Sequence, residues 1–172
     1  QSNLDLNKEI SFESFKGQIL DDYKLIVTSR EASLLGRREV LSGKAKFGIF
    51  GDGKELPQIA LAKVFQNGDF RSGYYRDQTF MMAINELNPK QLFSALYANT
   101  DINEEPMSAG RQMGAHFNTV SLNEDGSWKD LVNQKNSSSD VSCTASQMPR
   151  LLGLAQASKL YRKFTIKNKF SK

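Results

Sequence analysis

The sequence predicts a predominantly helical α/β domain with few strands. Five segments carry apolar residues at helical spacing, whereas only one or two short stretches suit a strand. The 172 residues suffice for one domain with a buried core, and an apolar content of 39% excludes a disordered chain. We therefore expect residues 1–172 to form a single folded domain.

The first predicted helix runs from about Ser11 to Leu35 and ends near Gly36. Its apolar residues recur at intervals of four, four and three, which places them on one helix face. They are Phe15, Ile19, Tyr23 and Ile26. The pattern is typical of an amphipathic helix.

Turns, a short helix and an extended segment are expected next. Residues 42–54 are rich in Gly and Lys, which favours turns, and Pro57 then falls in the first turn of a helix that residues 67–69 stop. Residues 70–76 are predicted to be extended, and Asp77 can cap the helix that follows them.

A further helix begins at Asn88. This residue is a good N-cap, Pro89 suits the first helical position, and Gln91 falls where a capping box needs its side chain. Residues 98–142 then show no persistent period, and so long an irregular stretch is usually functional when it is ordered. A last helix starts at Gln147.

The formal charge of +4 has an uneven distribution. Residues 150–172 hold seven basic residues and no acidic one, so the remaining 16 basic residues face 19 acidic ones and residues 1–149 carry −3. The excess therefore belongs to the last helix and to a basic tail over residues 163–172. This segment is either a solvated helix end with a tail or an arm that follows phosphates.

Several classes of protein are excluded by composition. The single Cys143 rules out an intramolecular disulfide and a multi-cysteine zinc site, and the single His116 rules out a His-rich metal centre. No apolar run is long enough for a membrane helix, and the polar start does not look like a signal peptide. We expect a soluble, cytoplasmic protein.

Three motifs carry possible chemistry. Around Tyr75 and Arg76, a guanidinium, a phenol and a helix N-terminus could hold an anion, although such a pattern is more often a packed aromatic and a surface salt bridge. His116 lies on a Gly-containing loop as a possible general acid or a structural histidine. Residues 142–147 offer hydroxyls and carbonyls that could contact a polar ring or a monovalent cation, or form an N-capping region.

In this order, the motifs Gly73–Asp77, Gly110–His116 and Ser142–Pro149, the last followed by Gly153-Leu154-Ala155, resemble one enzyme family. It is the alpha subunit of the thiamine diphosphate-dependent 2-oxo acid dehydrogenases, in particular the branched-chain (2-oxoisovalerate) type of bacteria with fused alpha and beta parts. The resemblance covers Tyr23 to Tyr161 and implies an N-terminal fragment of the thiamine diphosphate-binding fold. It also implies that the Mg²⁺ signature lies downstream and that the activating glutamate belongs to the beta part.

The resemblance implies specific roles for the motif residues. Tyr75 and Arg76 would bind the cofactor diphosphate, and His116 would help to position the 2-oxo acid. Ser142 and the backbone at Thr144 would meet the aminopyrimidine ring. A structural K⁺ would be surrounded by the carbonyls of Val141 and Cys143 and the side chains of Ser146 and Gln147.

The implied activity is oxidative decarboxylation of a branched-chain 2-oxo acid with reductive acylation of a lipoyl domain. Thiamine diphosphate and Mg²⁺ would be the cofactors, and the partners would be the beta part and a lipoyl-bearing dihydrolipoyl acyltransferase. The fragment alone is expected to be inactive. Two alternatives are a nucleic-acid or protein-binding module that uses the basic C-terminal segment, and a small regulator that mimics the alpha subunit.

Overall fold

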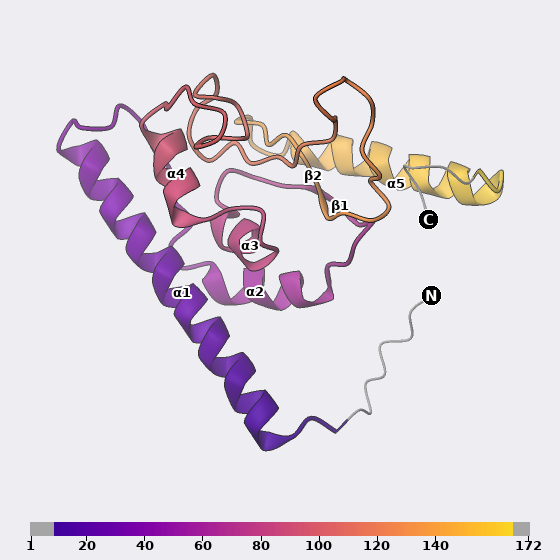
Figure 1. Cartoon of the computed structure of the whole chain (residues 1–172), viewed down its shortest axis with the longest axis horizontal. Helices are drawn as coiled ribbons and strands as arrows, with labels where there is room; N and C mark the ends of the chain where they lie inside the picture. Colours follow the sequence, from indigo (N-terminus) through magenta and orange to yellow (C-terminus); the bar gives the residue numbers. More distant parts are fainter. Residues whose placement is uncertain (1–8, 167–172) are drawn as a thin grey trace.

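The computed structural model describes residues 9–166 as a mixed, mainly helical structure with few strands, as the sequence predicts (Figure 1). A long helix lies along one side of the body, shorter helices and a two-stranded sheet fill the middle, and the last helix extends away on the opposite side. In order, the elements are α1 (Phe12–Leu41), α2 (Glu55–Val64), β1 (Phe70–Ser72), α3 (Gln78–Ala83), α4 (Pro89–Leu96), β2 (Asn136–Ser138) and α5 (Gln147–Lys163).

Helix α1 is longer than its sequence pattern indicates. Ser11 caps it by accepting a hydrogen bond from the Ser14 N–H, but the helix continues through Gly36 to Leu41. The predicted end at Gly36 is therefore wrong. A Cβ at this position would lie 2.3 Å from the Phe50 Cζ atom, so the glycine serves a close approach of the following segment and not a helix end.

The apolar stripe of α1 is largely uncovered. Phe15, Ile19 and Tyr23 are each at least half exposed, because the N-terminal half of the helix projects beyond the body (Figure 1). The buried residues of α1 are small ones in its C-terminal half: Ser29, Ala32, Ser33 and Gly36. Helical spacing identifies an apolar face, but it does not show whether another element covers that face.

The core lies where α1, α2 and α3 meet. Phe80, Met81 and Met82 of α3 are buried there against Ala32 and Ala62. Polar groups join the same helices, since the Ser29 and Thr79 hydroxyls lie 2.6 Å apart. The Gln78 side-chain amide donates to the Ser33 hydroxyl at 2.8 Å in the same network. Buried polar groups need such partners, so this network also fixes how α3 lies across α1.

The two strands are parallel neighbours, with Phe70 opposite Asn136 and Ser72 opposite Ser138. The segment through Thr119 takes the other edge of β2, because the backbone N–H of Thr119 donates to the Ser137 carbonyl at 3.0 Å. Apart from β2 and one isolated bridge, residues 98–142 form turns and bends. The irregular stretch therefore lies beside the sheet.

The remaining helices begin where the sequence places them. Asn88 and Gln91 form the predicted capping box of α4, with Pro89 in the first turn. Helix α5 starts at Gln147 but has no buried residue. Most of the predicted basic tail, residues 167–172, lies outside the described residues. Among residues 9–166, no helix has both the length and the apolarity needed to cross a membrane.

Candidate functional site

A cavity of about 230 Å³ collects residues from four segments that lie far apart in the sequence. It is lined by Phe47, Ile49, Tyr75, Met113, Gly114, His116 and Ser142. Each of the three predicted motifs contributes one candidate residue: Tyr75, His116 and Ser142. The cavity is smaller than the range of about 300–1,000 Å³ that is usual for ligand pockets, so it holds a small ligand or one part of a larger one.

The His116 imidazole makes two hydrogen bonds that fix its orientation. Its Nδ1 lies 3.0 Å from the Met113 carbonyl oxygen, and its Nε2 lies 2.6 Å from the Ser142 Oγ. A carbonyl only accepts, so Nδ1 carries a hydrogen. In the neutral ring Nε2 then accepts from the Ser142 hydroxyl, and this leaves a polarised hydroxyl at the cavity wall.

Tyr75 belongs to a chain of hydroxyl groups. The Tyr74 hydroxyl lies 2.7 Å from that of Tyr75 and 3.3 Å from that of Thr144, while the two tyrosine rings stack with centroids 3.8 Å apart. The pKa of Tyr74 is lowered by its hydrogen bonds with Thr144 and, to a smaller extent, with Tyr75. The pKa of Tyr75 is raised by its hydrogen bond with Tyr74.

Arg76 is exposed beside this chain of hydroxyls. Its guanidinium carbon lies 5.8 Å from the centroid of the Tyr75 ring, and its backbone carbonyl accepts from the Gln58 side-chain amide at 3.0 Å. Among residues 9–166, no carboxylate pairs with this guanidinium. The simple alternative of a surface salt bridge at Arg76 is therefore not what the structure forms.

Arg71 supports the site from the buried side, a role that the sequence does not indicate. Its buried guanidinium pairs with Asp140 at 3.0 Å and with Asp77 at 2.7 Å, and it also donates to the Tyr74 carbonyl. Burial raises the pKa of Asp140, while the charge of Arg71 and its hydrogen bond oppose this. Arg71 thus ties the Tyr74 segment to the strand end that leads to Ser142.

Asp77 directs its carboxylate to this network. It accepts from the Tyr74 N–H at 3.0 Å and from Arg71, and it makes no side-chain cap on α3. The residue occupies the N-cap position as predicted, but its side chain organises the turn before the helix. The local sequence around Arg71 gives no sign that it pairs with Asp77, so this contact is visible only in the structure.

Glu105 shapes the loop that precedes His116. It is 1% exposed, and its carboxylate accepts backbone hydrogen bonds from Met107, Ser108 and Gly110 and a side-chain bond from Ser108. Burial would raise the pKa of Glu105, but the bonds from Ser108, Gly110 and Met107 lower it overall. A carboxylate held by several donors stays ionised and rigidifies the loop.

The candidate K⁺ ligands lie around the start of α5. The Cys143 carbonyl accepts from the Ser146 N–H at 3.2 Å, and the Gln147 carbonyl accepts from the Ser72 hydroxyl at 3.0 Å. The Gln147 side-chain oxygen is buried and has no partner within the described chain. Neutral oxygen donors of this kind suit a hard monovalent cation, and Val141 precedes them in sequence. Over the described residues, no group of His, Cys, Asp and Glu side chains could hold a metal ion.

Comparison with protein-family models, with curated proteins and with solved structures finds no match for this chain.

Proposed function

We propose that this chain contributes to the decarboxylating dehydrogenase component of a 2-oxo acid dehydrogenase complex, of the thiamine diphosphate-dependent, branched-chain type. The supporting observation is the meeting of Tyr75, His116 and Ser142 at one cavity, although the three residues are far apart in the sequence. The proposed location is the cytoplasm. The chain would be an N-terminal part of the thiamine diphosphate-binding fold.

The side chains of the site suit distinct parts of thiamine diphosphate. Arg76 lacks a carboxylate partner in the described chain and, with the Tyr75 hydroxyl, offers donors for the diphosphate. Ser142 and the backbone near Thr144 offer hydrogen-bonding groups for the aminopyrimidine ring. The cavity of about 230 Å³ takes one part of such a cofactor, and the remainder needs further protein.

His116 suits the handling of a 2-oxo acid. When bound, thiamine diphosphate supplies the nucleophilic carbon that attacks the keto group. His116 can hold a proton on Nε2 only when its ring is charged or when its Met113 contact is lost, so its hydrogen bonding to an oxo group depends on how Ser142 shares its proton. Its role is to position the substrate and its acyl product.

The proposed assembly also needs parts that this chain does not supply. These are the beta part with its activating glutamate, a Mg²⁺ site for the diphosphate and a lipoyl-bearing dihydrolipoyl acyltransferase that accepts the acyl group. The K⁺ position near Gln147 would stabilise the start of α5. The chain of residues 1–172 is therefore expected to be inactive alone.

The test is a combined gene and activity measurement. A reading frame that continues after Lys172 into a strand and a Mg²⁺ signature would support the proposal, and a stop codon directly after Lys172 would contradict it. Purified residues 1–172 should release no CO₂ from 2-oxoisovalerate with thiamine diphosphate and Mg²⁺. Measurable decarboxylation would count against the division of the active site that we propose.

A second candidate function uses the basic end of α5. The helix has no buried residue, and Phe164 is 62% exposed with the Lys163 ammonium 5.6 Å from its ring centroid. Basic and aromatic side chains together suit single-stranded nucleic acid or an acidic protein surface. A titration with single-stranded DNA at low and moderate salt decides between the two functions, because this alternative requires steeply salt-dependent binding.

A further inference from the structure

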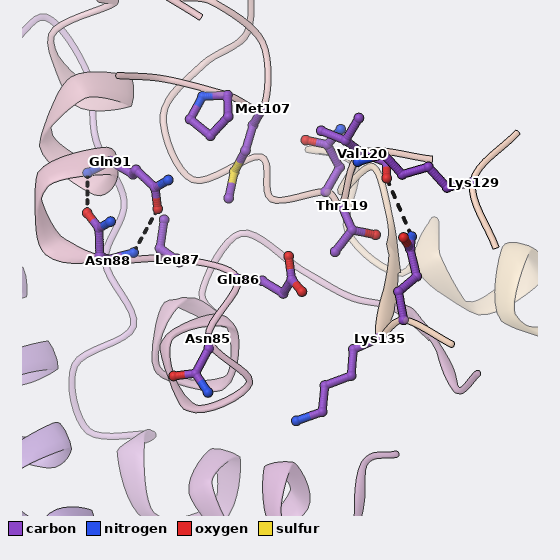
Figure 2. A pocket seen from close by; sticks show the side chains of 13 residues that line it. Asn85, Glu86, Leu87, Asn88, Gln91, Met107, Thr119, Val120, Lys129 and Lys135 are labelled. Atoms are coloured by element: carbon purple, nitrogen blue, oxygen red, sulfur yellow. Dashed lines mark hydrogen bonds between the residues drawn. The ribbon is translucent and has the colours of Figure 1, made fainter. Parts of the chain in front are cut away.

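A second cavity, of about 480 Å³, shares no lining residue with the candidate site. Its walls come from the turn between α3 and α4, from the first turn of α4 and from the segments near residues 106, 119 and 134 (Figure 2). Its volume falls within the range of about 300–1,000 Å³ that small-molecule sites occupy. It is therefore large enough for a metabolite of modest size.

Glu86 brings a carboxylate into this cavity. Asn85 adopts a left-handed backbone conformation with φ 64°, which turns the chain just before Glu86, and Figure 2 shows the carboxylate directed into the open space. Within residues 9–166 this carboxylate has no ion pair and no hydrogen bond from a side chain or backbone group. Burial raises the pKa of Glu86, and the nearby charges of Lys135 and Lys129 oppose that shift.

Two lysines bring positive charge to the same cavity as the Glu86 carboxylate. Lys129 and Lys135 both line it, and neither ammonium pairs with a carboxylate of the described chain. Glu86, Lys129 and Lys135 are all partly exposed, so the acid and the two amines remain accessible from the cavity. This arrangement leaves both charges open to a ligand.

The cavity also has an apolar wall. Leu87 and Met107 supply apolar surface, and Leu87 is only 6% exposed. This wall offers contact to the apolar part of a ligand.

We propose that this cavity binds a free α-amino acid with an apolar side chain. The ligand ammonium donates to Glu86, its carboxylate meets Lys129 and Lys135, and its side chain contacts Met107 and Leu87. A zwitterion matches both signs of charge, whereas a simple anion would leave Glu86 repelled and a simple amine would leave both lysines unused. The site is independent of the cavity at His116.

The test uses L-leucine as the probe, with binding followed by NMR and calorimetry. Two matched compounds each lack one charged group: 4-methyl-2-oxopentanoate lacks the ammonium, and 3-methylbutylamine lacks the carboxylate. L-leucine should bind at least about tenfold more tightly than either, since each loses a charge-assisted contact. Its binding should shift the amide signals of Glu86 and Lys135.

Glu86→Gln and Lys135→Gln should each weaken L-leucine binding by about tenfold. The matched controls Glu13→Gln and Lys46→Gln, which are exposed far from the cavity, should leave it unchanged. Circular dichroism establishes that each variant folds, and the second cavity variant preserves the test if one does not.

The absence of L-leucine binding, equally tight binding of the oxo acid, or an L-leucine affinity that both cavity variants leave unchanged from the parent would each overturn the proposal. None of these results bears on the 2-oxo acid dehydrogenase function, because no residue is shared between the two cavities.

Discussion

His116 and Ser142 are 26 residues apart in the chain, yet the imidazole Nε2 lies 2.6 Å from the serine Oγ. The Met113 carbonyl holds the other ring nitrogen at 3.0 Å, so one neutral tautomer is selected. This pair joins two of the three motifs that suggested the function. It is also the contact whose chemistry is most accessible to experiment.

The tautomer itself can be measured. Nitrogen-15 NMR of the neutral His116 ring should show the hydrogen on Nδ1, because Nδ1 donates to Met113 and Nε2 accepts from Ser142. Ser142→Ala should reduce the share of this tautomer, whereas Ser158→Ala on the exposed side of α5 should not. A ring that carries its hydrogen on Nε2 in the unsubstituted protein would contradict the assignment.

Acid should destabilise the protein through Glu55. The Arg30 guanidinium holds this 4%-exposed carboxylate by two hydrogen bonds, and with the Gly53 N–H it lowers the pKa of Glu55 to about 2. The pKa of Glu55 in the folded protein is below its unfolded value of about 4.3. The ionised Glu55 therefore stabilises the fold fully above about pH 4.3, and this contribution is lost as the pH falls towards about 2.

The measurement is denaturant unfolding of Glu55→Gln and the parent between about pH 6 and about pH 2.5. At the higher pH the variant should be less stable by on the order of 2 kcal/mol, and at the lower pH the gap should nearly close. The exposed Glu13→Gln serves as the control. A gap that is independent of pH would show that the Arg30 contact does not shift the Glu55 titration.

Two glycines of α1 should respond oppositely to alanine. At Gly36 the new Cβ would lie 2.3 Å from the Phe50 ring, so Gly36→Ala should cost about 1–3 kcal/mol of unfolding free energy. At Gly17 there is no heavy atom within 4 Å, and Gly17→Ala should stabilise by about 0.5–1 kcal/mol. Thermal unfolding of both variants is the check, and a change of the same sign in both would refute the close approach of Phe50.

The exposed stripe of α1 should contribute little to stability. Ile19 is 50% exposed, whereas Met81 is 0% exposed in the core. Ile19→Ala should therefore change the unfolding free energy by no more than about 0.5 kcal/mol, and Met81→Ala should cost about 2–5 kcal/mol. Chemical denaturation of the isolated chain compares the two. A large loss for Ile19→Ala would mean that another surface covers the stripe in solution.

The sequence predicted local features better than distant contacts. The capping box at Asn88 and the start of α5 depend on neighbouring residues, and both are present. Local sequence predicts a helix end at Gly36, but the glycine instead allows the close approach of Phe50, fourteen residues later. The exposure of the apolar stripe of α1 is not predicted for the same reason, because the spacing of apolar residues does not show which elements lie beside the helix.

The candidate site shows the same limit. Tyr75, His116 and Ser142 were named from short motifs, and the structure places them at one cavity. Arg71 and Glu105 hold these motifs in place, but neither has a distinctive sequence context. The pairing of Arg71 depends on Asp140, 69 residues later in the chain. The hydrogen bonds of Glu105 depend on the geometry of the turn that follows it. The charges of the second cavity likewise come together only in the folded chain.

The central claim is tested most directly by a dehydrogenase assay on the chain expressed with its downstream reading frame and a beta part. The account predicts 2-oxoisovalerate-dependent reduction of an artificial electron acceptor that requires thiamine diphosphate and Mg²⁺. Arg76→Gln should raise the thiamine diphosphate concentration for half-maximal activity by at least about tenfold, while Arg38→Gln on α1 leaves it unchanged. The absence of any thiamine diphosphate-dependent activity in that assembly would contradict the account.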